Sequence, residues 1–178
     1  MAVNSQIDHD WLELSSLRPG DIPAIAAHYA YEVENGVATF DTTAPDEEYW
    51  QQKLLRSQSG EYPIWVGRDG TSESAVVGWA GVSPFDPKLA YERTAEFSFY
   101  VLDDYHGRGV GRLLMQHTLN HLRDHTTIKV LVSRIALEQE ASLHLHRALG
   151  FNHVGTLEHV GFKLGKSLSV ALYQYDLT

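Results

Sequence analysis

The sequence predicts a single domain of the α/β class, in which helices cover the faces of a mixed, mostly antiparallel twisted sheet. Three observations lead to this expectation. The chain has 178 residues, which is the size of one domain. Segments with the two-residue alternation of strands are interleaved with segments in which apolar residues recur every three or four positions. Their order along the chain is β-α-α-β-β-β-α-β-α-β-β, which is typical of a sheet with helices on its faces.

The first third of the chain is expected to hold one strand and two helices. Residues 1–13 are predicted to be an N-terminal tail, so the domain is expected to span residues 14–178. A short strand over Leu14–Arg18 precedes a helix that Asp21 is expected to cap. A second helix is expected from about residue 45 to residue 56. The apolar face of the first helix is predicted to contain Ile22, Ile25, Ala26, Tyr29 and Val33.

The middle of the chain predicts three strands. Ile64–Arg68 and Ala75–Val82 lie on either side of an Asp-Gly turn, which is typical of an antiparallel hairpin. Arg93–Val101 is the third strand. Its residues alternate between two faces, so that Phe97, Phe99 and Val101 lie on one face and Glu96, Ser98 and Tyr100 on the other.

The last third of the chain predicts two helices and three strands. The first helix follows a glycine-rich turn, and a strand over Lys129–Ile135 comes next. The second helix, Ala141–Leu149, ends at Gly150, the usual C-terminal position of glycine. Strands over Phe151–Leu157 and Ser169–Asp176 complete the sheet. The predicted buried faces of the two helices are Val110, Leu113, Leu114, Thr118 and Leu122 in the first, and Ala141, Leu145, Ala148 and Leu149 in the second.

Composition limits the classes of protein to which the chain can belong. The net charge of −9 opposes binding to nucleic acid or to an anionic membrane, because such partners require surplus lysine and arginine. The chain has no cysteine, so disulfides, thiolate zinc sites and cysteine nucleophiles are excluded. No apolar run is long enough to span a bilayer, and residues 1–11 do not resemble a secretory signal. We therefore expect a cytoplasmic protein that binds neither nucleic acid nor membrane.

A glycine-rich turn between a strand and a helix is the sharpest local feature. It reads His106-Gly107-Arg108-Gly109-Val110-Gly111, and Arg112 follows. Glycines let the backbone approach a ligand closely, and the first turn of the helix offers free N–H groups to a diphosphate. The spacing is not that of a dinucleotide-binding G-x-G-x-x-G motif, and the Lys-Ser/Thr pair of a P-loop is absent. A glycine-rich connection that binds nothing is the alternative interpretation.

Four segments resemble the GNAT superfamily of acetyltransferases and, within it, the phosphinothricin and methionine sulfoximine N-acetyltransferase family. The turn is similar to the family's Q/R-x-x-G-x-G/A loop, with His106 at the Gln/Arg position. Residues 94–101, Thr-Ala-Glu-Phe-Ser-Phe-Tyr-Val, resemble its T-V-E-x-S-x-Y-V strand. Residues 141–151 resemble its A-S-x-x-L-H-x-x-L-G-F helix, and residues 160–166 its V-G-F-K-x-G-R segment. Weaker similarity extends over the N-terminal half.

The resemblance implies acetyl-CoA as the co-substrate, no metal, and a homodimer. It also implies that the fourth and fifth strands splay apart near residues 100–102, which frees backbone N–H groups for the pantetheine and the thioester oxygen. The residues that the resemblance assigns to cofactor binding are Phe99, Tyr100, Val101, His106, Gly107, Arg108, Gly109, Val110, Gly111, Arg112, Gln139 and Ser142.

Two side chains are candidates for proton transfer. An amine with a pKa near 8 or above is largely protonated at neutral pH and must lose a proton before it can attack. Glu96, which matches the family's strand Glu, is the candidate base; the alternative is a carboxylate paired with Arg93 or another cation. His146 is a candidate to protonate the CoA sulfur or to join the base relay. Its alternative is a histidine hydrogen-bonded at the edge of the core.

The resemblance implies that the acceptor is the primary amine of a small molecule, an amino acid or an amino-acid analogue. A lysine and an arginine are candidates to hold its carboxylate or phosphonate, and three aromatic residues are candidates for the pocket wall. Solvated charges and ordinary core aromatics are the alternatives. At Asp86 the sequence departs from the family, which has a basic residue there. The candidate substrate-binding residues are Phe40, Phe85, Lys88, Tyr91 and Arg93.

Other functions stay open from the sequence alone. A polyamine or protein N-terminal acetyltransferase is one alternative, and a non-catalytic acyl-CoA-binding sensor is another. His117, His121 and His125 recur every four residues, but they do not match the zinc protease motif, because its Glu is missing. A solvated polar face is favoured for these histidines, and no metal site is predicted.

Overall fold

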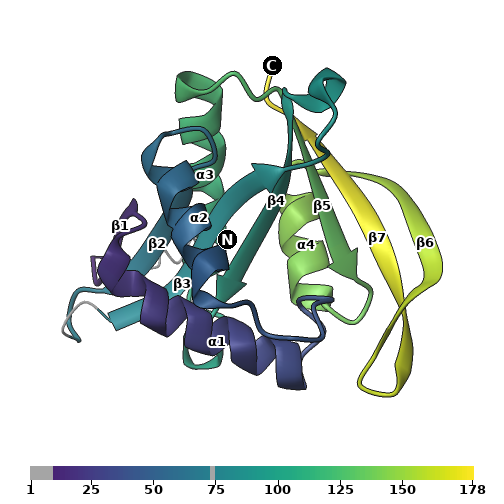
Figure 1. Cartoon of the computed structure of the whole chain (residues 1–178), viewed down its shortest axis with the longest axis horizontal. Helices are drawn as coiled ribbons and strands as arrows, with labels where there is room; N and C mark the ends of the chain where they lie inside the picture. The colour runs from purple at the N-terminus through teal and green to yellow at the C-terminus, as the bar shows by residue number, and fades with distance from the viewer. Residues whose placement is uncertain (1–9, 73–74) are drawn as a thin grey trace, which may run out of the picture.

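The computed structural model describes residues 10–72 and 75–178, which form one twisted sheet with helices on both faces (Figure 1). The strands are β1 (Leu12–Ser16), β2 (Ile64–Asp69), β3 (Ala75–Pro84), β4 (Thr94–Val101), β5 (Val130–Ala136), β6 (Asn152–Lys163) and β7 (Lys166–Asp176). The helices are α1 (Ile22–Asn35), α2 (Glu47–Gln58), α3 (Val110–His125) and α4 (Glu140–Ala148). Single turns of 3₁₀ helix lie at Pro19–Asp21, Leu89–Tyr91 and Asp103–Tyr105.

The predicted α/β class and element order are confirmed, whereas several boundaries differ. β1 begins at Leu12, two residues before the predicted start, because its pairing with β2 extends to Asp69. Of the predicted tail, residues 1–9 lie outside the described residues. β6 and β7 are both longer than predicted, since they pair with each other as far as the turn between Lys163 and Lys166. In the described residues, no helix is both long enough and apolar enough to cross a membrane.

The sheet is antiparallel except at its centre, where β4 and β5 run parallel. The strand order is β1-β2-β3-β4-β5-β7-β6. Only three pairs join β4 to β5: Thr94 with Val130, Ala95 with Leu131 and Glu96 with Val132. β4 continues to pair with β3 as far as Val101, so from residue 97 onward its other edge has no strand partner. The predicted splay is therefore confirmed, and it starts earlier than the predicted residues 100–102.

Two hydrophobic clusters fill the two faces of the sheet. Neighbouring residues of one strand belong to different clusters, as the alternation of side chains requires: Trp65 packs on the cluster with α3, and Val66 belongs to the cluster with α1 and α2. Figure 1 shows α1 and α2 together on one side of the sheet. The buried face of α3 is wider than predicted, because Met115 and Leu119 are buried as well. Leu113, which was predicted to be buried, is only half-buried.

The buried face of α4 agrees only in part with the apolar pattern, because Leu145 and Leu149 pack against the core as predicted. Ala141 and Ala148 are exposed, whereas Leu143 and His146 are buried. A polar residue occupies this core position because both of its ring nitrogens have hydrogen-bond partners inside the protein. Periodicity alone therefore identifies only part of the face through which the helix packs on the sheet.

A buried ion pair joins the start of α1 to the sheet. Asp21 stands at the N-cap position of α1, but its carboxylate accepts no hydrogen bond from the helix, contrary to the predicted cap. It accepts instead from Arg68 Nε at 3.0 Å, from Arg68 Nη2, and from the backbone N–H of Arg18 at 2.7 Å. Arg68 also donates to the Ser15 hydroxyl of β1. Asp21 is 6% exposed and Arg68 3%, so the pair fixes β1, β2 and α1 against one another within the protein interior.

Replacing Asp21 by Asn is expected to lower the free energy of unfolding by about 3–5 kcal/mol, because it leaves the buried Arg68 charge without its counter-charge. Urea denaturation monitored by circular dichroism measures this loss. Asp46→Asn is the matched control, since Asp46 caps α2 at an exposed position and Asn is an equally good cap. Equal stabilities of the two variants would contradict the importance assigned to the ion pair.

Candidate active site

The site is built around the point where β4 and β5 separate. At this fork the Ser133 hydroxyl of β5 lies 3.2 Å from the Phe97 carbonyl of β4, to which it can donate. A large cleft of about 970 Å³ and a smaller cavity of about 430 Å³ lie at the fork. We call them the fork cleft and the inner cavity. The residues that line both are Ala38, Phe97, Ser98, Tyr100, Arg134 and Ala136.

The glycine-rich turn forms one end of the fork cleft. Gly107 and Gly109 have φ values of +71° and +83°, a backbone conformation that side chains disfavour. Gly111 is required for a different reason, because a Cβ there would lie 3.1 Å from Phe99 Cε2 and 3.2 Å from Leu145 Cδ2. The turn leads directly into α3, whose first backbone N–H groups have no carbonyl partner within the helix. This arrangement fits a diphosphate at the N-terminus of α3.

The fork cleft brings together eleven of the twelve residues expected to bind the cofactor. They are Phe99, Tyr100, Val101, His106, Gly107, Gly109, Val110, Gly111, Arg112, Gln139 and Ser142. Arg108 does not line the cleft. Its guanidinium stacks 4.1 Å from the ring centre of Trp11 and 4.8 Å from that of Tyr105, so cation–π contacts hold it outside. His106 Nε2 lies 2.8 Å from the Val101 carbonyl, which fixes its ring beside the turn.

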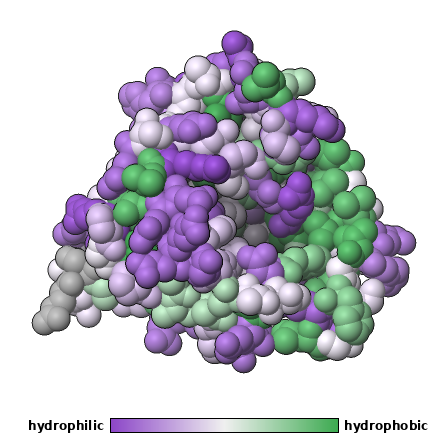
Figure 2. Space-filling model, viewed as in Figure 1, coloured by the Kyte–Doolittle hydropathy of each residue, from purple (hydrophilic) through white to green (hydrophobic). Residues whose placement is uncertain are grey.

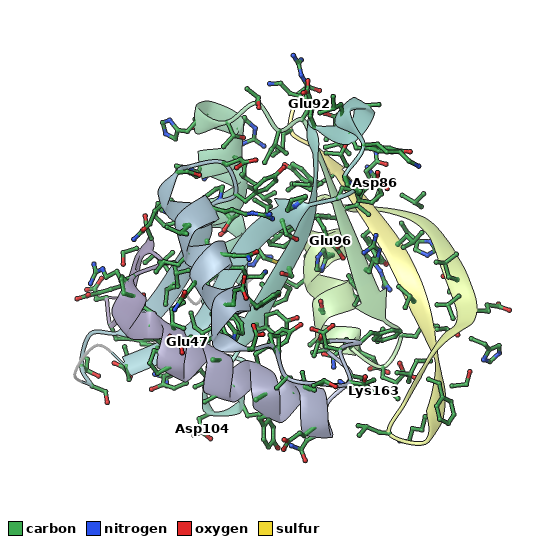
Figure 3. The ribbon with its side chains drawn as sticks, in the orientation of Figure 1. Glu47, Asp86, Glu92, Glu96, Asp104 and Lys163 are labelled. Carbon is green, nitrogen blue, oxygen red and sulfur yellow. The ribbon has the colours of Figure 1, made fainter. Side chains whose placement is uncertain are left out.

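Glu96 lies on β4 at the last residue pair before the fork. Its carboxylate lines the inner cavity and is half-buried. Arg134 Nη1 donates to Glu96 Oε2 at 2.8 Å, so the carboxylate is paired with a cation, although not with Arg93. Figure 3 labels Glu96 near the centre of the molecule, whereas Asp86 and Glu92 lie farther toward the upper end of β4. The position of Glu96 at the junction allows it to contact a group bound in the inner cavity.

His146 is only 2% exposed and is held by a chain of hydrogen bonds between α4 and β4. Its Nδ1 lies 2.8 Å from the Ser142 carbonyl and its Nε2 3.1 Å from the Ser133 hydroxyl, which also contacts the Phe97 carbonyl. A carbonyl only accepts, so Nδ1 carries the ring proton and Nε2 is an acceptor. The Ser133 hydroxyl has one proton, which it can donate either to Nε2 or to the Phe97 carbonyl. Burial lowers the pKa of His146 to about 4, despite the opposing effect of the Ser142 carbonyl. The ring is therefore neutral at pH 7.

The inner cavity contains one of the five residues expected to bind substrate. Phe40 lines it, whereas Phe85, Lys88, Tyr91 and Arg93 are not among its lining residues. The reason is that these four lie between the end of β3 and the start of β4, beyond the cavity. The rings of Phe85 and Tyr91 contact each other at 5.4 Å, and Phe85 lies 5.7 Å from the Arg134 guanidinium.

Sequence reasoning missed three charged residues of the inner cavity: Lys53, Asp41 and Arg134. A signal for Lys53 was present, because it lies three residues after Trp50 on the inward face of α2, where a cation is unexpected. The alternation of β5 likewise places Arg134 between the buried residues Ser133 and Ile135, on the side of the sheet that faces α2. Asp41 lies in a connecting segment and had no local signal.

The segment between α1 and α2 forms a wall of the inner cavity and is held by the β6–β7 hairpin. Lys163 Nζ donates to the carbonyls of Glu32 at 3.0 Å and Thr39 at 2.7 Å; Figure 3 shows Lys163 beside this segment. Phe40 packs on Gly161, where a Cβ would lie 2.3 Å from the ring. Two residues of the family-like segment 160–166 thus position the cavity wall.

Two of the three histidines of α3 pack against Trp65, and the third packs against one of these two. The ring centre of His117 lies 4.2 Å from that of Trp65, and the ring centre of His121 lies 5.0 Å away. His125 contacts the ring of His121. Over residues 10–72 and 75–178, no group of three His, Cys, Asp or Glu side chains is arranged to hold a metal ion.

Comparisons with known proteins agree with this geometry. Residues 27–151 match the model of the acetyltransferase (GNAT) family. The phosphinothricin N-acetyltransferase of Alcaligenes faecalis is 33% identical over 90% of this chain and 80% of its own length. An L-methionine sulfoximine/L-methionine sulfone acetyltransferase of Pseudomonas aeruginosa is 34% identical over 88% of this chain and 90% of its own.

A solved structure shows the same fold with the expected donor. The crystal structure of a phosphinothricin acetyltransferase from Sinorhizobium meliloti in complex with acetyl-CoA has a TM-score of 0.84 and 30% identity. The similarity covers 93% of this chain and 88% of that one. The resemblance found in the sequence is thereby confirmed. The chain belongs to the GNAT family of acetyltransferases.

Proposed function

We propose that this protein transfers the acetyl group of acetyl-CoA to the primary amine of an amino acid or amino-acid analogue of the phosphinothricin or methionine sulfoximine type. The observation that carries the proposal is that the fork cleft and the inner cavity share a wall at β4, and that Glu96 lines the inner cavity next to this wall. A donor in one space and an acceptor in the other would meet there. The relatives named for these two acceptors support the choice of substrate class.

The residues of the fork cleft fit acetyl-CoA. The N–H groups at the start of α3 suit the diphosphate, and the positive φ values of Gly107 and Gly109 let the backbone face it. The unpaired edge of β4 beyond residue 97 offers backbone groups to the pantetheine arm. A backbone N–H directed at the thioester oxygen would stabilise the charge that develops there as the amine attacks.

Glu96 is proposed as the base that accepts the amine proton. The acceptor arrives largely as an ammonium, because its pKa lies above neutral pH. Once Glu96 takes the first proton, the nitrogen lone pair attacks the thioester carbonyl carbon and a C–N bond forms. The C–S bond then breaks, and the nitrogen loses its second proton to solvent as the amide forms. The departing CoA thiolate then takes a proton from solvent. Arg134 holds the Glu96 carboxylate in position in the absence of acceptor.

His146 is proposed to position the fork. A pKa of about 4 leaves its ring unprotonated at neutral pH, which opposes a role as proton donor to the sulfur. Its hydrogen bonds to Ser133 and Ser142 instead support a role in fixing the distance between α4 and the two strands. Phe97 lines both the fork cleft and the inner cavity, so the shape of their shared wall depends on the distance between α4 and the two strands.

The charges of the inner cavity favour an amino acid over a polyamine. A polyamine would be matched by an acidic wall, whereas this cavity contains the cations Lys53 and Arg134 as well as Asp41 and Glu96. An acceptor that carries both an amine and an acid matches both signs of charge. We include a cytoplasmic location in the proposal because acetyl-CoA is a cytoplasmic metabolite.

We also propose that two copies associate through β6. This strand is an edge of the sheet, and its exposed apolar residues are Val154, Leu157, Val160 and Phe162. Figure 2 shows a hydrophobic area on the right of the molecule, where Figure 1 places β6 and β7. An exposed edge with an apolar surface is typical of a protein–protein interface, because it otherwise promotes aggregation.

Glu96→Gln is expected to lower kcat about 100-fold or more, since Gln cannot accept the amine proton, while the affinity for acetyl-CoA stays unchanged. Release of free CoA thiol with phosphinothricin or methionine sulfone as acceptor measures kcat. Glu92→Gln is the matched control, because it removes an exposed carboxylate outside both spaces. A Glu96→Gln enzyme with normal kcat would refute the assigned base. Wild-type protein that binds acetyl-CoA but acetylates neither acceptor would refute the function.

The pKa of His146 predicts acid sensitivity. The folded-state pKa of about 4 lies below the usual 6.5, so the unfolded chain binds the proton more tightly. The stabilisation is complete above pH 6.5 and is lost as pH falls toward 4. We expect a loss of about 2 kcal/mol between about pH 7.5 and pH 5. Urea denaturation of His146→Leu should show less of this loss, and the exposed His144→Leu should show all of it; equal pH profiles would contradict the assignment.

Phe162→Glu is expected to convert the proposed dimer to a monomer, because it places a charge in the apolar area of β6. Size-exclusion chromatography with light scattering measures the molar mass. Leu55→Glu is the control, since Leu55 is 66% exposed on α2 and Phe162 is 74% exposed on β6. A wild-type protein that stays monomeric at high concentration would refute the proposed association.

A further inference from the structure

The inner cavity contains a cation that the proposed chemistry leaves unused. Lys53 of α2 lines the cavity beside Tyr49 and Trp50. Its ammonium lies 5.2 Å above the ring centre of Tyr49. In the described residues it makes no salt bridge within 4.0 Å and no hydrogen bond. Three strong donors therefore face a partly buried space without an acceptor from the protein.

The ammonium of Lys53 is removed from solvent without a carboxylate at ion-pair distance in the described residues. Burial lowers the pKa of its ammonium, and the carboxylates of Glu96 and Asp41 oppose this shift without reaching it as ion-pair partners. A desolvated charge that lacks hydrogen bonds is costly, and an anionic ligand group would remove that cost. The cavity is therefore suited to an acid at the wall formed by α2.

Arg134 provides a second cationic position at the opposite wall. One of its N–H groups bonds to Glu96, and the guanidinium is about half exposed at the junction of the two spaces. A guanidinium has five N–H donors, so it can bind another carboxylate while it stays in contact with Glu96. In an α-amino acid the amine and the carboxylate are attached to the same carbon. Glu96 and Arg134, which touch, can bind these two groups together.

Lys53 is placed for a group farther along the acceptor. It lies beyond ion-pair distance of Glu96, yet close enough for Glu96 to affect its protonation. Building on the proposed function, we propose that Arg134 binds the α-carboxylate of the acceptor and that Lys53 binds an acidic group on its side chain. Lys53 is then the residue that determines specificity. The preferred acceptor is an amino acid with an anionic side chain, such as a phosphinate or carboxylate, rather than one with a neutral sulfone.

Two acceptors that differ in side-chain charge test the proposal. Phosphinothricin carries an anionic phosphinate, and methionine sulfone carries a neutral sulfone. Lys53→Gln is expected to raise KM for phosphinothricin about 10- to 100-fold, which corresponds to one charge-assisted hydrogen bond. KM for methionine sulfone should change less than about twofold. Lys53→Arg, which keeps the charge, should recover part of the phosphinothricin activity.

Arg56→Gln is the matched control. It removes the same charge one turn farther along α2, outside the inner cavity, and should leave both KM values unchanged. Thermal denaturation of each variant checks that it is folded. Equal changes of both KM values in Lys53→Gln, or no change in either, would overturn the role assigned to Lys53.

Failure of the proposed function has a different signature. If wild-type protein releases no thiol with either acceptor, the acetyl transfer proposed above is wrong, and calorimetry with phosphinothricin in the presence of CoA then tests Lys53 alone. Binding that weakens about tenfold in Lys53→Gln supports the anionic subsite. Equal binding by both proteins, or no binding to wild type, overturns it.

Discussion

The separation of β4 from β5 is the constraint on which the rest of this molecule depends. The two strands share three residue pairs and then diverge, which leaves one edge of β4 without a strand partner. Buried backbone groups need hydrogen bonds, so an open edge persists only where another part of the protein, or a ligand, satisfies it. Here the Ser133 hydroxyl lies within hydrogen-bond distance of the first carbonyl beyond the last pair and of Nε2 of the buried His146, and its one proton can go to either acceptor. The remaining edge faces the fork cleft.

The same divergence explains why the chemistry lies where it does. Glu96 is in the last pair before the strands part, so it is held as firmly as a sheet residue while it borders an open space. The glycine turn follows β4 after one turn of 3₁₀ helix, which places the start of α3 at the other end of the same cleft. The strand β4 thus determines the relative positions of the proposed base, the proposed acyl site and the proposed diphosphate site.

Local features of the site are predictable from the sequence, and contacts between distant segments are not. The positive φ at Gly107 and Gly109 follows from residue type, and the start of α3 follows from its periodicity. The contact of Glu96 with Arg134 depends on the register between two parallel strands, which no local pattern specifies. Arg108 turns away from the cleft because Trp11, nearly one hundred residues earlier in the chain, offers its ring. The apolar pattern identifies only part of the buried face of α4, since a hydrogen-bonded histidine can replace an aliphatic residue in a core.

The contacts of Lys163 and Gly161 give the outermost hairpin of the sheet an influence on the catalytic interior. The hairpin turns through Leu164 and Gly165, both with positive φ, and its last β6 residue fastens the segment that bears Phe40. Substitutions in this hairpin can therefore alter which acceptor is bound, although they lie far from the reacting atoms. Loop grafts or affinity tags inserted at this turn would therefore disturb the segment that carries Phe40.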